Sequence, residues 1–248
     1  MKKLMKRALI ITGIILVLLI LLVGAYLLMF QYETGKMTPL ESQAFNEDVY
    51  VIQDSFVNMF LIKGDEHYIA IDAGNNAGHI RQELGKLNIE EAEVVAVFLT
   101  HTDADHTAAL SLFTNARIYI SEAEEQMIDG RTPRFLFVNN TLASEPELVE
   151  DGQVITVSGL KVHGILTPGH TPGAMSYLMD DKYLFVGDSL SLEEGKVNLF
   201  NDFFNMDSET QRTSLKKLVD LPGVEYLFTA HYGVTDNMLR LFPPVRNK

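Results

Sequence analysis

A long run of uncharged residues near the N-terminus constrains this chain more than any other feature of its sequence. From Ala8 to Phe30 there are 23 residues without a charged side chain, and nearly all of them are apolar. A helix of this length measures about 35 Å, and the hydrocarbon core of a bilayer is about 30 Å thick. Because the run has no polar face, it does not fit a helix buried on one side in a soluble core. We therefore predict one transmembrane helix over residues 8–30.

Basic residues on one side of this run predict its orientation. Four lie within the first seven positions, and the next one after the run is Lys36. Since basic flanks favour the cytoplasmic side, we expect residues 1–7 to form a cytoplasmic tail of a single-pass cell-membrane protein. The alternative is a cleaved signal peptide, whose apolar core spans about 7–15 residues and ends in small side chains. This run is longer and ends in bulky Tyr-Leu-Leu-Met-Phe, which favours an uncleaved signal anchor with the rest of the chain outside the cytoplasm.

The part of the chain after this helix is strongly acidic. The whole sequence has a net charge of −13, but residues 37–248 carry 15 basic and 32 acidic side chains, a net charge of −17. We expect residues 31–46 to be a polar linker and residues 47–248 to be one domain. An acidic surface repels polyanions, and contacts to phosphate need basic groups. The charge therefore argues against nucleic acid and favours a small-molecule substrate.

Runs of apolar and β-branched residues predict a mixed fold for residues 47–248. Several strands come in succession, and helical segments lie between some of them, which predicts sheets covered by helices rather than strict alternation. The predicted strands are 49–52, 58–62, 68–72, 94–99, 117–120, 153–157, 161–166, 176–179, 183–186 and 224–228. The predicted helices are 79–87, 108–113, one from Ser121 and 208–219, and the segment Arg131–Glu150 reads as irregular.

Four of these strands end in a loop that carries His, Asp or both. The loops are Thr100–Thr107 (Thr-His-Thr-Asp-Ala-Asp-His-Thr), Thr167–Gly173 (Thr-Pro-Gly-His-Thr-Pro-Gly), Gly187–Asp188 and Thr229–Gly233 (Thr-Ala-His-Tyr-Gly). Strand ends that lie side by side bring their loops together, and carboxylates gathered there need a cation to offset their charge. The chain has no cysteine, so imidazole and carboxylate groups must supply any metal ligands.

Other interpretations exist for each loop taken alone. A single His after a strand is usually a surface residue, and an acidic loop is usually solvated. The Asp-Ala-Asp segment also lacks the glycine and the later acidic ligands of a calcium-binding EF-hand loop. All four loops in one domain favour a metal centre instead. The remaining histidines, His67, His79 and His163, are expected to be structural or solvated.

In chain order, these loops resemble the His-x-His-x-Asp-His, His, Asp, His series of the metallo-β-lactamase superfamily. Ile71–Gly74 also resembles that family's early strand-end Asp-x-Gly, and Thr167–Gly173 resembles the glyoxalase II and lactonase branches. The resemblance covers about residues 47–233. It implies an α+β fold, a four-layer αββα sandwich, here preceded by one N-terminal transmembrane helix, and a hydrolase that uses two divalent metal ions.

The resemblance also implies a role for each residue of the series. His101 and His170 would bind the first ion, Asp105, His106 and His231 the second, and Asp188 would bridge the two. A hydroxide held between the ions would be the nucleophile, because a bound divalent metal lowers the pKa of water toward about 7. Asp105 is also the predicted catalytic residue, because it would orient that hydroxide or carry its proton. Thr100, Thr107 and Thr171 would support the ligands, with loop or helix capping as the equal alternative.

One position departs from the family pattern. Asp103 stands where the family has its second His, and a carboxylate there would be an anionic, harder ligand of the first ion. It would add negative charge and shift the metal preference from zinc toward manganese or iron. Zinc remains the first expectation, and the departure affects the identity of the metal and the filling of the first site.

The substrate is less constrained than the metal centre. Only 17 residues follow His231, which leaves no room for an appended helical substrate-binding domain and weakens a glutathione thioester as substrate. We expect a small ester, lactone, thioester or amide, with residues 131–150 as a lid or pocket wall. Tyr177 and Tyr232 are candidates to polarise a carbonyl, although aromatic packing explains them as well. The alternatives are a phosphodiesterase of the same fold and a non-catalytic, metal-stabilised binding module.

Overall fold

The computed structural model describes residues 2–193, 196–219 and 221–236. The described chain divides into two compact units, one up to Met37 and one from Thr38 onward. Residues 237–248 lie outside the described residues. They are the last 12 residues both of the predicted domain 47–248 and of the segment that follows His231.

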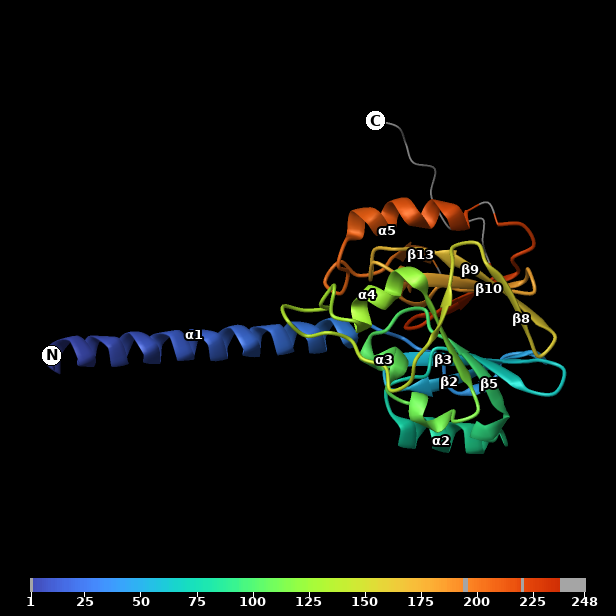
Figure 1. Ribbon diagram of the computed structural model, residues 1–248, viewed down its shortest axis with the longest axis horizontal. Helices are drawn as coiled ribbons and strands as arrows, with labels where there is room; N and C mark the ends of the chain where they lie inside the picture. Colours follow the sequence, from blue (N-terminus) through green and yellow to red (C-terminus); the bar gives the residue numbers. More distant parts are fainter. Residues whose placement is uncertain (1, 194–195, 220, 237–248) are drawn as a thin grey trace. The chain divides into compact units, whose positions relative to one another are not determined.

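The first unit is a single long helix, α1 (Lys2–Thr34), drawn in blue in Figure 1. It extends beyond the uncharged run at both ends. At its C-terminal end the Thr34 hydroxyl donates to the carbonyl of Phe30, and the Gly35 N–H donates to the carbonyl of Gln31. Its mean hydropathy reaches 3.1, and its apolar side chains are exposed. By length and composition it is able to cross a membrane, although a signal sequence has the same properties.

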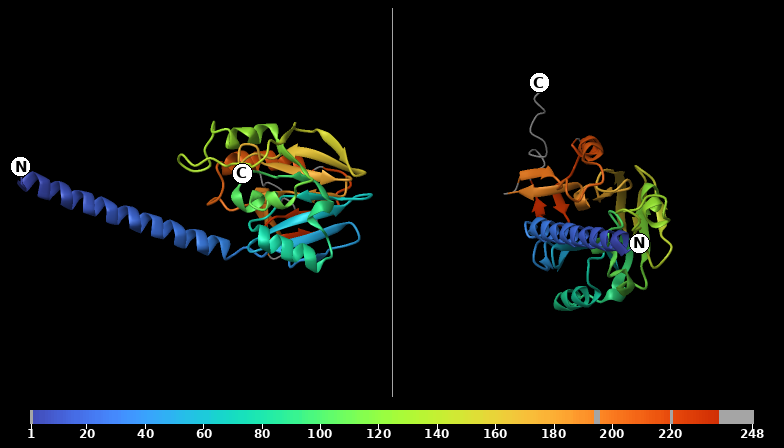
Figure 2. Two further views of the ribbon diagram at one scale, coloured as in Figure 1. Left: turned by 60° about the horizontal axis from the view of Figure 1, so that its bottom comes forward. Right: turned by 90° about the vertical axis from the view of Figure 1, so that its left-hand side faces the viewer.

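The second unit contains two β-sheets that pack face to face, with helices on their outer faces (Figures 1 and 2). The seven-stranded sheet has the order β1 (Gln43–Ala44), β2 (Val49–Asp54), β3 (Val57–Lys63), β4 (Tyr68–Ile71), β5 (Val94–Phe98), β6 (Arg117–Ser121) and β7 (Glu147–Val149). The six-stranded sheet has the order β15 (Gly233–Thr235), β14 (Tyr226–Thr229), β11 (Tyr183–Phe185), β10 (Met175–Met179), β9 (Leu160–Leu166) and β8 (Val154–Val157).

Helices and short turns complete the unit. The α-helices are α2 (Ala77–Lys86), α3 (Ala104–Thr107), α4 (Glu125–Ile128) and α5 (Ser208–Ser214), and β12 (Leu190–Glu193) pairs with β13 (Lys196–Leu199). The 3₁₀ turns are Glu91–Glu93, Leu110–Leu112, Glu122–Glu124, Gly187–Ser189 and Leu215–Leu218. In Figure 1, α2 and α5 lie on opposite outer sides of the two sheets. This arrangement confirms the predicted α+β, four-layer αββα fold.

Side chains that alternate between the two faces of a strand contribute to separate hydrophobic cores. In β3, Phe60 and Ile62 face the core between the two sheets, whereas Met59 and Leu61 face the core under α2. Both sets are buried because successive side chains of a strand point to opposite faces and both faces of this sheet are covered. A third core lies between the six-stranded sheet and the helical segment 208–218. This explains why the central strands read as continuous apolar runs.

Strand direction decides where the loops meet. β4 and β5 are parallel, and so are β11 and β14. β9 runs in the same direction as β11, because both are antiparallel to the intervening β10. The carboxyl ends of neighbouring parallel strands lie at the same edge of a sheet. The loops after β9, β11 and β14 therefore open at one edge of the six-stranded sheet, and the loop after β5 meets them where Gly187 lies against Thr100.

Some details of the secondary structure differ from the sequence-based expectations. The helix predicted over 108–113 was wrong: α3 ends at Thr107, and only the 3₁₀ turn Leu110–Leu112 follows. The region predicted as irregular, 131–150, ends in β7, which extends the sheet by pairing with β6. The hairpin of β12 and β13 was not predicted. The short β7 is extended because it pairs with β6, and its own three residues give little indication of a strand.

Candidate metal centre

The loop after β5 supplies four polar side chains to the open edge. His101 and Asp103 lie in the loop itself, and Asp103 immediately precedes α3. The single turn of α3 then carries Asp105 and His106. Because a helical turn and an extended loop point their side chains differently, consecutive acidic and imidazole groups reach different parts of the same site.

The loop between β9 and β10 places His170. Its ends are closed by a bond from the Thr167 N–H to the carbonyl of Ala174. Gly169 has φ +144°, and a Cβ there would overlap the backbone of Gln211. Glycine is therefore required at this position, and the close approach fixes the loop against α5.

The two remaining loops place Asp188 and His231. Gly187 has φ +51°, and a Cβ there would overlap the side chain of Thr100. This contact brings the end of β11 against the end of β5, although the two belong to different sheets. His231 follows β14, and its Nδ1 lies 2.7 Å from the carbonyl oxygen of Phe56.

All seven predicted ligands lie in one cluster. The Asp188 carboxylate is at its centre, where Oδ1 lies 3.0 Å from His231 Nε2 and 3.4 Å from His106 Nε2. Its other oxygen, Oδ2, lies 3.4 Å from His170 Nε2 and 3.9 Å from His101 Nε2. On one side of the cluster, Asp105 Oδ2 lies 3.6 Å from the Nε2 atoms of both His106 and His231.

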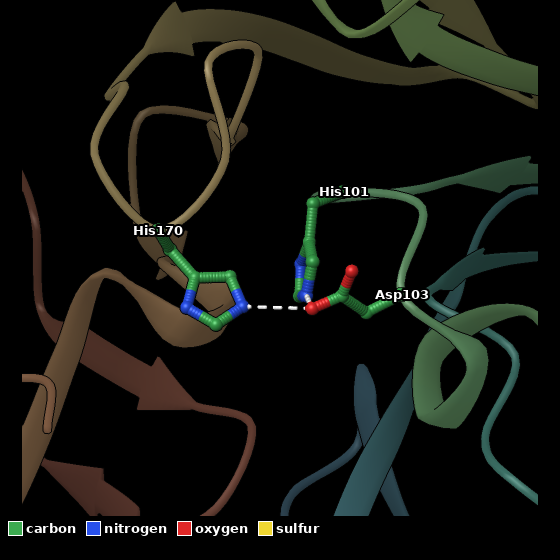
Figure 3. A group of neighbouring side chains, drawn as sticks. All are labelled: His101, Asp103 and His170. Atoms are coloured by element: carbon green, nitrogen blue, oxygen red, sulfur yellow. Dashed lines mark hydrogen bonds and ion pairs between the residues drawn. The ribbon is translucent and has the colours of Figure 1, made fainter. Parts of the chain in front are cut away.

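His101, Asp103 and His170 form the other side of the cluster (Figure 3). Asp103 Oδ2 lies 3.1 Å from His170 Nε2 and 3.6 Å from His101 Nε2. Figure 3 shows the Asp103 carboxylate reaching toward both imidazole rings from the loop it shares with His101. Asp103 thus lies beside the two histidines with which the sequence grouped it.

The hydrogen bonds of the four histidines direct one nitrogen of each ring toward the centre. In each ring Nδ1 faces an acceptor outside the cluster, and these acceptors are Thr100 Oγ1 for His101, Asp72 Oδ2 for His106, Asn205 Oδ1 for His170 and the Phe56 carbonyl for His231. An Nδ1–H that donates outward leaves Nε2 with its lone pair, which is the arrangement of metal-binding histidines.

Four polar atoms of the cluster are buried without a hydrogen-bond partner among the described residues. They are His101 Nε2, His106 Nε2, His231 Nε2 and Asp188 Oδ1. Buried polar atoms are nearly always paired, because leaving them unpaired costs about 1–3 kcal/mol each. Three groups of possible ligand atoms share these residues, each with its atoms within 4.8 Å of one another. The donor set of imidazole and carboxylate therefore fits divalent cations.

The electrostatics of the cluster reflect this crowding. Burial opposes ionisation of Asp188, but the rings of His231, His106 and His170 hold its pKa well below the usual range. Burial also disfavours protonation of His106, but the carboxylates of Asp72, Asp105 and Asp188 hold its pKa well above the usual range. Both shifts favour a proton on the His106 ring beside these carboxylates in the metal-free protein, and a bound cation would have to replace that proton.

Two buried carboxylates outside the cluster hold its loops, and neither was among the predicted site residues. Asp72 accepts hydrogen bonds from the N–H and hydroxyl of Thr100 and from His106. Glu124 accepts from the N–H and hydroxyl of Thr102, from the hydroxyl of Thr171 and from the N–H of Gly173. The Asp-x-Gly pattern pointed to Asp72, whereas Glu124 showed only the spacing of a helix cap.

Arg134 and Asn140 are two further residues that the sequence did not single out. Both come from the segment predicted to be a lid or pocket wall, and both donate to the Asp103 carboxylate. Asn140 also donates to the hydroxyl of Thr102. No sequence motif marks either residue, since only the folded loop brings them to the site.

The supporting residues named from the sequence fall into two groups. Thr100 and Thr171 contact the buried carboxylates Asp72 and Glu124, whereas the Thr107 hydroxyl bonds to the Asp103 carbonyl one turn back in α3. Tyr177 is buried in the core between the sheets and donates to the Leu99 carbonyl, so it packs rather than faces a substrate. Tyr232 lies half-buried beside the core under α5.

The other three histidines do not join the cluster. His79 pairs with Asp54 and Glu83 at the start of α2. His163 lies in β9, and His67 lies in the turn between β3 and β4. These positions agree with the structural or solvated roles expected from the sequence.

Comparison with known proteins places this arrangement in a family. A model of the metallo-beta-lactamase superfamily matches residues 52–231. Among curated proteins, glyoxylase B2 of Dictyostelium discoideum is 30% identical, covering 53% of this chain and 47% of that protein. A probable polyketide biosynthesis zinc-dependent hydrolase of Bacillus velezensis, BaeB, is 30% identical, covering 61% and 58% respectively. The chain thus spans about half of the length of these relatives.

Solved structures share the fold. A metallo-beta-lactamase from Cronobacter sakazakii superposes with a TM-score of 0.61 at 25% identity, covering 78% of this chain and 81% of that chain. A structure described as the first B3 metallo-beta-lactamase with an active site glutamic acid gives a TM-score of 0.64 at 17% identity, covering 86% and 89%. At the lower identity the likeness shows the fold alone.

Proposed function

The chain belongs to the metallo-β-lactamase superfamily, and from this premise we propose that it is a metal-dependent hydrolase. One observation carries the proposal: three imidazole nitrogens and one carboxylate oxygen are buried, face one another and lack hydrogen-bond partners among the described residues. A protein that uses these groups only for packing would have paired them. The name of BaeB as a zinc-dependent hydrolase supports the same chemistry.

We propose two divalent ions at this centre. His101, Asp103 and His170 would hold the first, and Asp105, His106 and His231 would hold the second. Asp188 would bridge them, because its two oxygens face the rings of different groups. Zinc is the first candidate for both ions, and manganese and iron are the alternatives, since Asp103 adds an oxygen ligand.

Divalent ions bound here would lower the pKa of water toward neutrality and polarise a carbonyl oxygen. The protein's own contribution is to orient the reactants and to move a proton. Asp105 is suited to the second task, because its side chain is 22% exposed while the neighbouring His106 and His231 rings are buried. Its carboxylate would orient the attacking water and accept its proton.

The proposed substrate is a small ester, lactone, thioester or amide. The acidic body disfavours polyanions, and curated relatives include hydroxyacylglutathione hydrolases and probable polyketide biosynthesis hydrolases. Phe135, Leu136, Phe137 and Val138 lie exposed in the segment whose neighbours Arg134 and Asn140 contact Asp103. This segment would form a wall of the substrate site and offer apolar surface to the substrate.

We further propose that α1 anchors the protein in the cell membrane. The helix would cross once over residues 8–30, with residues 1–7 in the cytoplasm, a linker over 31–46 and the hydrolase domain, 47–248, outside. The length and hydropathy of α1 and the four basic residues before the run support this proposal. Retention of Met1–Lys6 and resistance to alkaline extraction from membranes would test it, and cleavage after the apolar run would contradict it.

Metal analysis of the full-length protein tests the hydrolase proposal first. The detergent-purified chain should retain at least one equivalent of divalent metal after reconstitution and dialysis. It should then turn over at least one member of a panel containing a lactone, a thioester, an ester and a bis-aryl phosphate. Turnover of the phosphate alone would favour a phosphodiesterase, and bound metal without any turnover would favour a binding module.

Asp188→Ala and a matched variant, Asp202→Ala, complete the test. Asp188 is buried at the centre of the cluster, whereas Asp202 is an exposed aspartate outside it. Asp188→Ala should abolish turnover and lower the metal content, and Asp202→Ala should leave both unchanged. Full activity of Asp188→Ala would contradict the bridging role.

A further inference from the structure

Arg134 contacts Asp103, one of the three ligands proposed for the first ion (with His101 and His170). We call these three residues the first group of ligands, and Asp105, His106 and His231 the second. Its Nε lies 2.8 Å from Asp103 Oδ1 and 2.9 Å from Asp103 Oδ2, so the guanidinium covers both oxygens of the carboxylate. Its Nη2 donates to the Phe204 carbonyl at 2.8 Å, which fixes the side chain in place. The side chains of both ion-pair partners are largely buried, with 22% of Arg134 and 14% of Asp103 exposed.

We propose that Arg134 is the charge partner of Asp103 and that it opposes filling of the first metal subsite. This inference rests on the metal centre of the proposed function and concerns the order in which its two subsites fill. It assigns to Arg134 a positioning and selectivity role at the site, which no motif of the sequence indicates.

Charge balance is the first argument. Replacing a neutral imidazole ligand by Asp103 adds one negative charge to the site, and the guanidinium of Arg134 adds one positive charge in direct contact with it. The ligand set with Arg134 therefore has the same net charge as a set with His at this position. Because both side chains are largely buried, water screens the attraction between their charges much less than it would at the surface.

Competition for the ligand atoms is the second argument. Arg134 Nη2 lies 3.4 Å from His170 Nε2, the atom that would bind the first ion. Asn140 Nδ2 also donates to Asp103 Oδ1 at 3.0 Å. A metal ion would sit about 2.0–2.2 Å from its nitrogen and oxygen ligands, so it would share two of them with a fixed cation. Like charges this close repel, and the first subsite should bind its ion weakly.

The second group of ligands has no such competitor in the part of the chain that the structure describes. Among the described residues, no Lys or Arg forms an ion pair with Asp105 or Asp188, and His106 and His231 complete that group. One ion should therefore bind tightly to the second subsite. A second ion should bind at higher concentration, where it must displace or reorient Arg134.

Metal titration of the full-length, detergent-purified protein tests this order directly. The metal-free protein is titrated with Zn²⁺ against a chromophoric chelator, and the bound metal is counted by mass spectrometry after gel filtration. Wild type should show one tight equivalent and one weaker one. Arg134→Gln should strengthen the weaker site by about tenfold or more, because it removes the repelling charge. The zinc-induced rise in Tm should be correspondingly larger for Arg134→Gln.

Matched variants separate this effect from general damage. Arg131→Gln removes an exposed arginine of the same segment that pairs with Asp129 and Glu125, and both affinities should stay as in wild type. Arg134→Lys keeps the positive charge that repels the ion, and its weaker site should stay within about threefold of wild type. In an Asp103→Asn background the gain from Arg134→Gln should shrink, since the carboxylate that holds Arg134 beside the first subsite is absent.

The outcomes distinguish the inference from the proposed function. If Arg134→Gln leaves the weaker site unchanged or weakens it, or if its gain is the same in the Asp103→Asn background, the inference is overturned while the metal centre stands. If none of the proteins binds zinc, the proposed metal centre itself fails.

Discussion

Asp72 Oδ2 lies 2.9 Å from His106 Nδ1, and both side chains are buried. Asp72 has φ +60°, an unusual conformation for a residue other than glycine, and it also accepts two hydrogen bonds from Thr100. The local strain of this backbone is offset by contacts that fix the loops after β4 and β5 together. The carboxylate thus holds the imidazole with Nε2 facing the cluster.

Asp72→Asn should therefore weaken metal binding although Asp72 is not itself a ligand. Loss of the carboxylate partner of a ligating histidine typically lowers metal affinity by about 10–100-fold. Zinc titration of the variant measures the change, and the exposed Asp202→Asn is the control. Wild-type affinity in Asp72→Asn would show that other contacts orient His106.

Glu124→Ala should destabilise the domain strongly. The carboxylate is fully buried and accepts four hydrogen bonds that connect the loops of Thr102 and Thr171. Removing it leaves several buried donors unpaired, so the free energy of unfolding should fall by about 3 kcal/mol or more. Denaturant unfolding measures this, and Glu122→Ala, an exposed residue of the same turn, should change it by less than about 0.5 kcal/mol.

Metal binding should release protons near neutral pH. In the metal-free protein, burial disfavours protonation of His106 and His231, but the surrounding carboxylates still raise the pKa of both rings. A raised pKa favours the protonated ring, whose proton a metal must displace, so metal affinity should fall as the pH is lowered. Titration calorimetry in buffers of different ionisation enthalpy counts the protons. Binding without proton release would contradict the raised pKa values.

Gly173→Ala should disrupt the domain near the site. A Cβ at this position would overlap the backbone of Glu124, which cannot move as a flexible side chain can. The expected result is a large loss of soluble, folded protein, or a loss of stability of about 1–3 kcal/mol or more. Gly85→Ala is the matched control, because nothing lies within 4 Å of its Cβ position in α2. That change should stabilise the protein by about 0.5–1 kcal/mol.

Asp105→Asn should reduce turnover by more than it reduces metal content. The amide keeps the size of the side chain but cannot accept a proton, and general-base catalysis typically contributes about 10²–10⁴-fold. The rate constant should be measured on protein whose metal content has been determined in the same sample. A loss of activity fully explained by a loss of metal would leave Asp105 as a ligand only.

Local patterns in the amino-acid sequence predicted sheets covered by helices and selected the residues of the candidate site, and the family resemblance of the loops implied the four-layer sandwich. Continuous apolar runs such as residues 94–99 predicted strands buried on both faces, and β5 is such a strand. The loops after these strands carry the seven predicted ligands, from His101 to His231, and in the folded chain these residues lie in one cluster. Their role as ligands stays a prediction. Strand periodicity and strand-end loops are local properties, which is why a sequence displays them directly.

The surroundings of those residues depend on how distant segments pack. Asp72 bonds to His106, Glu124 to Thr102, and Arg134 to Asp103, and each of these contacts joins different segments of the chain. No local pattern indicates such pairs, because each depends on how separate loops meet at the edge of the two sheets. The sequence showed that a carboxylate replaces an imidazole at Asp103, and the fold showed that a buried guanidinium balances it. The partner of Asp103 depends on the fold because a charge removed from water needs a partner, and the folded chain determines which partner is within reach.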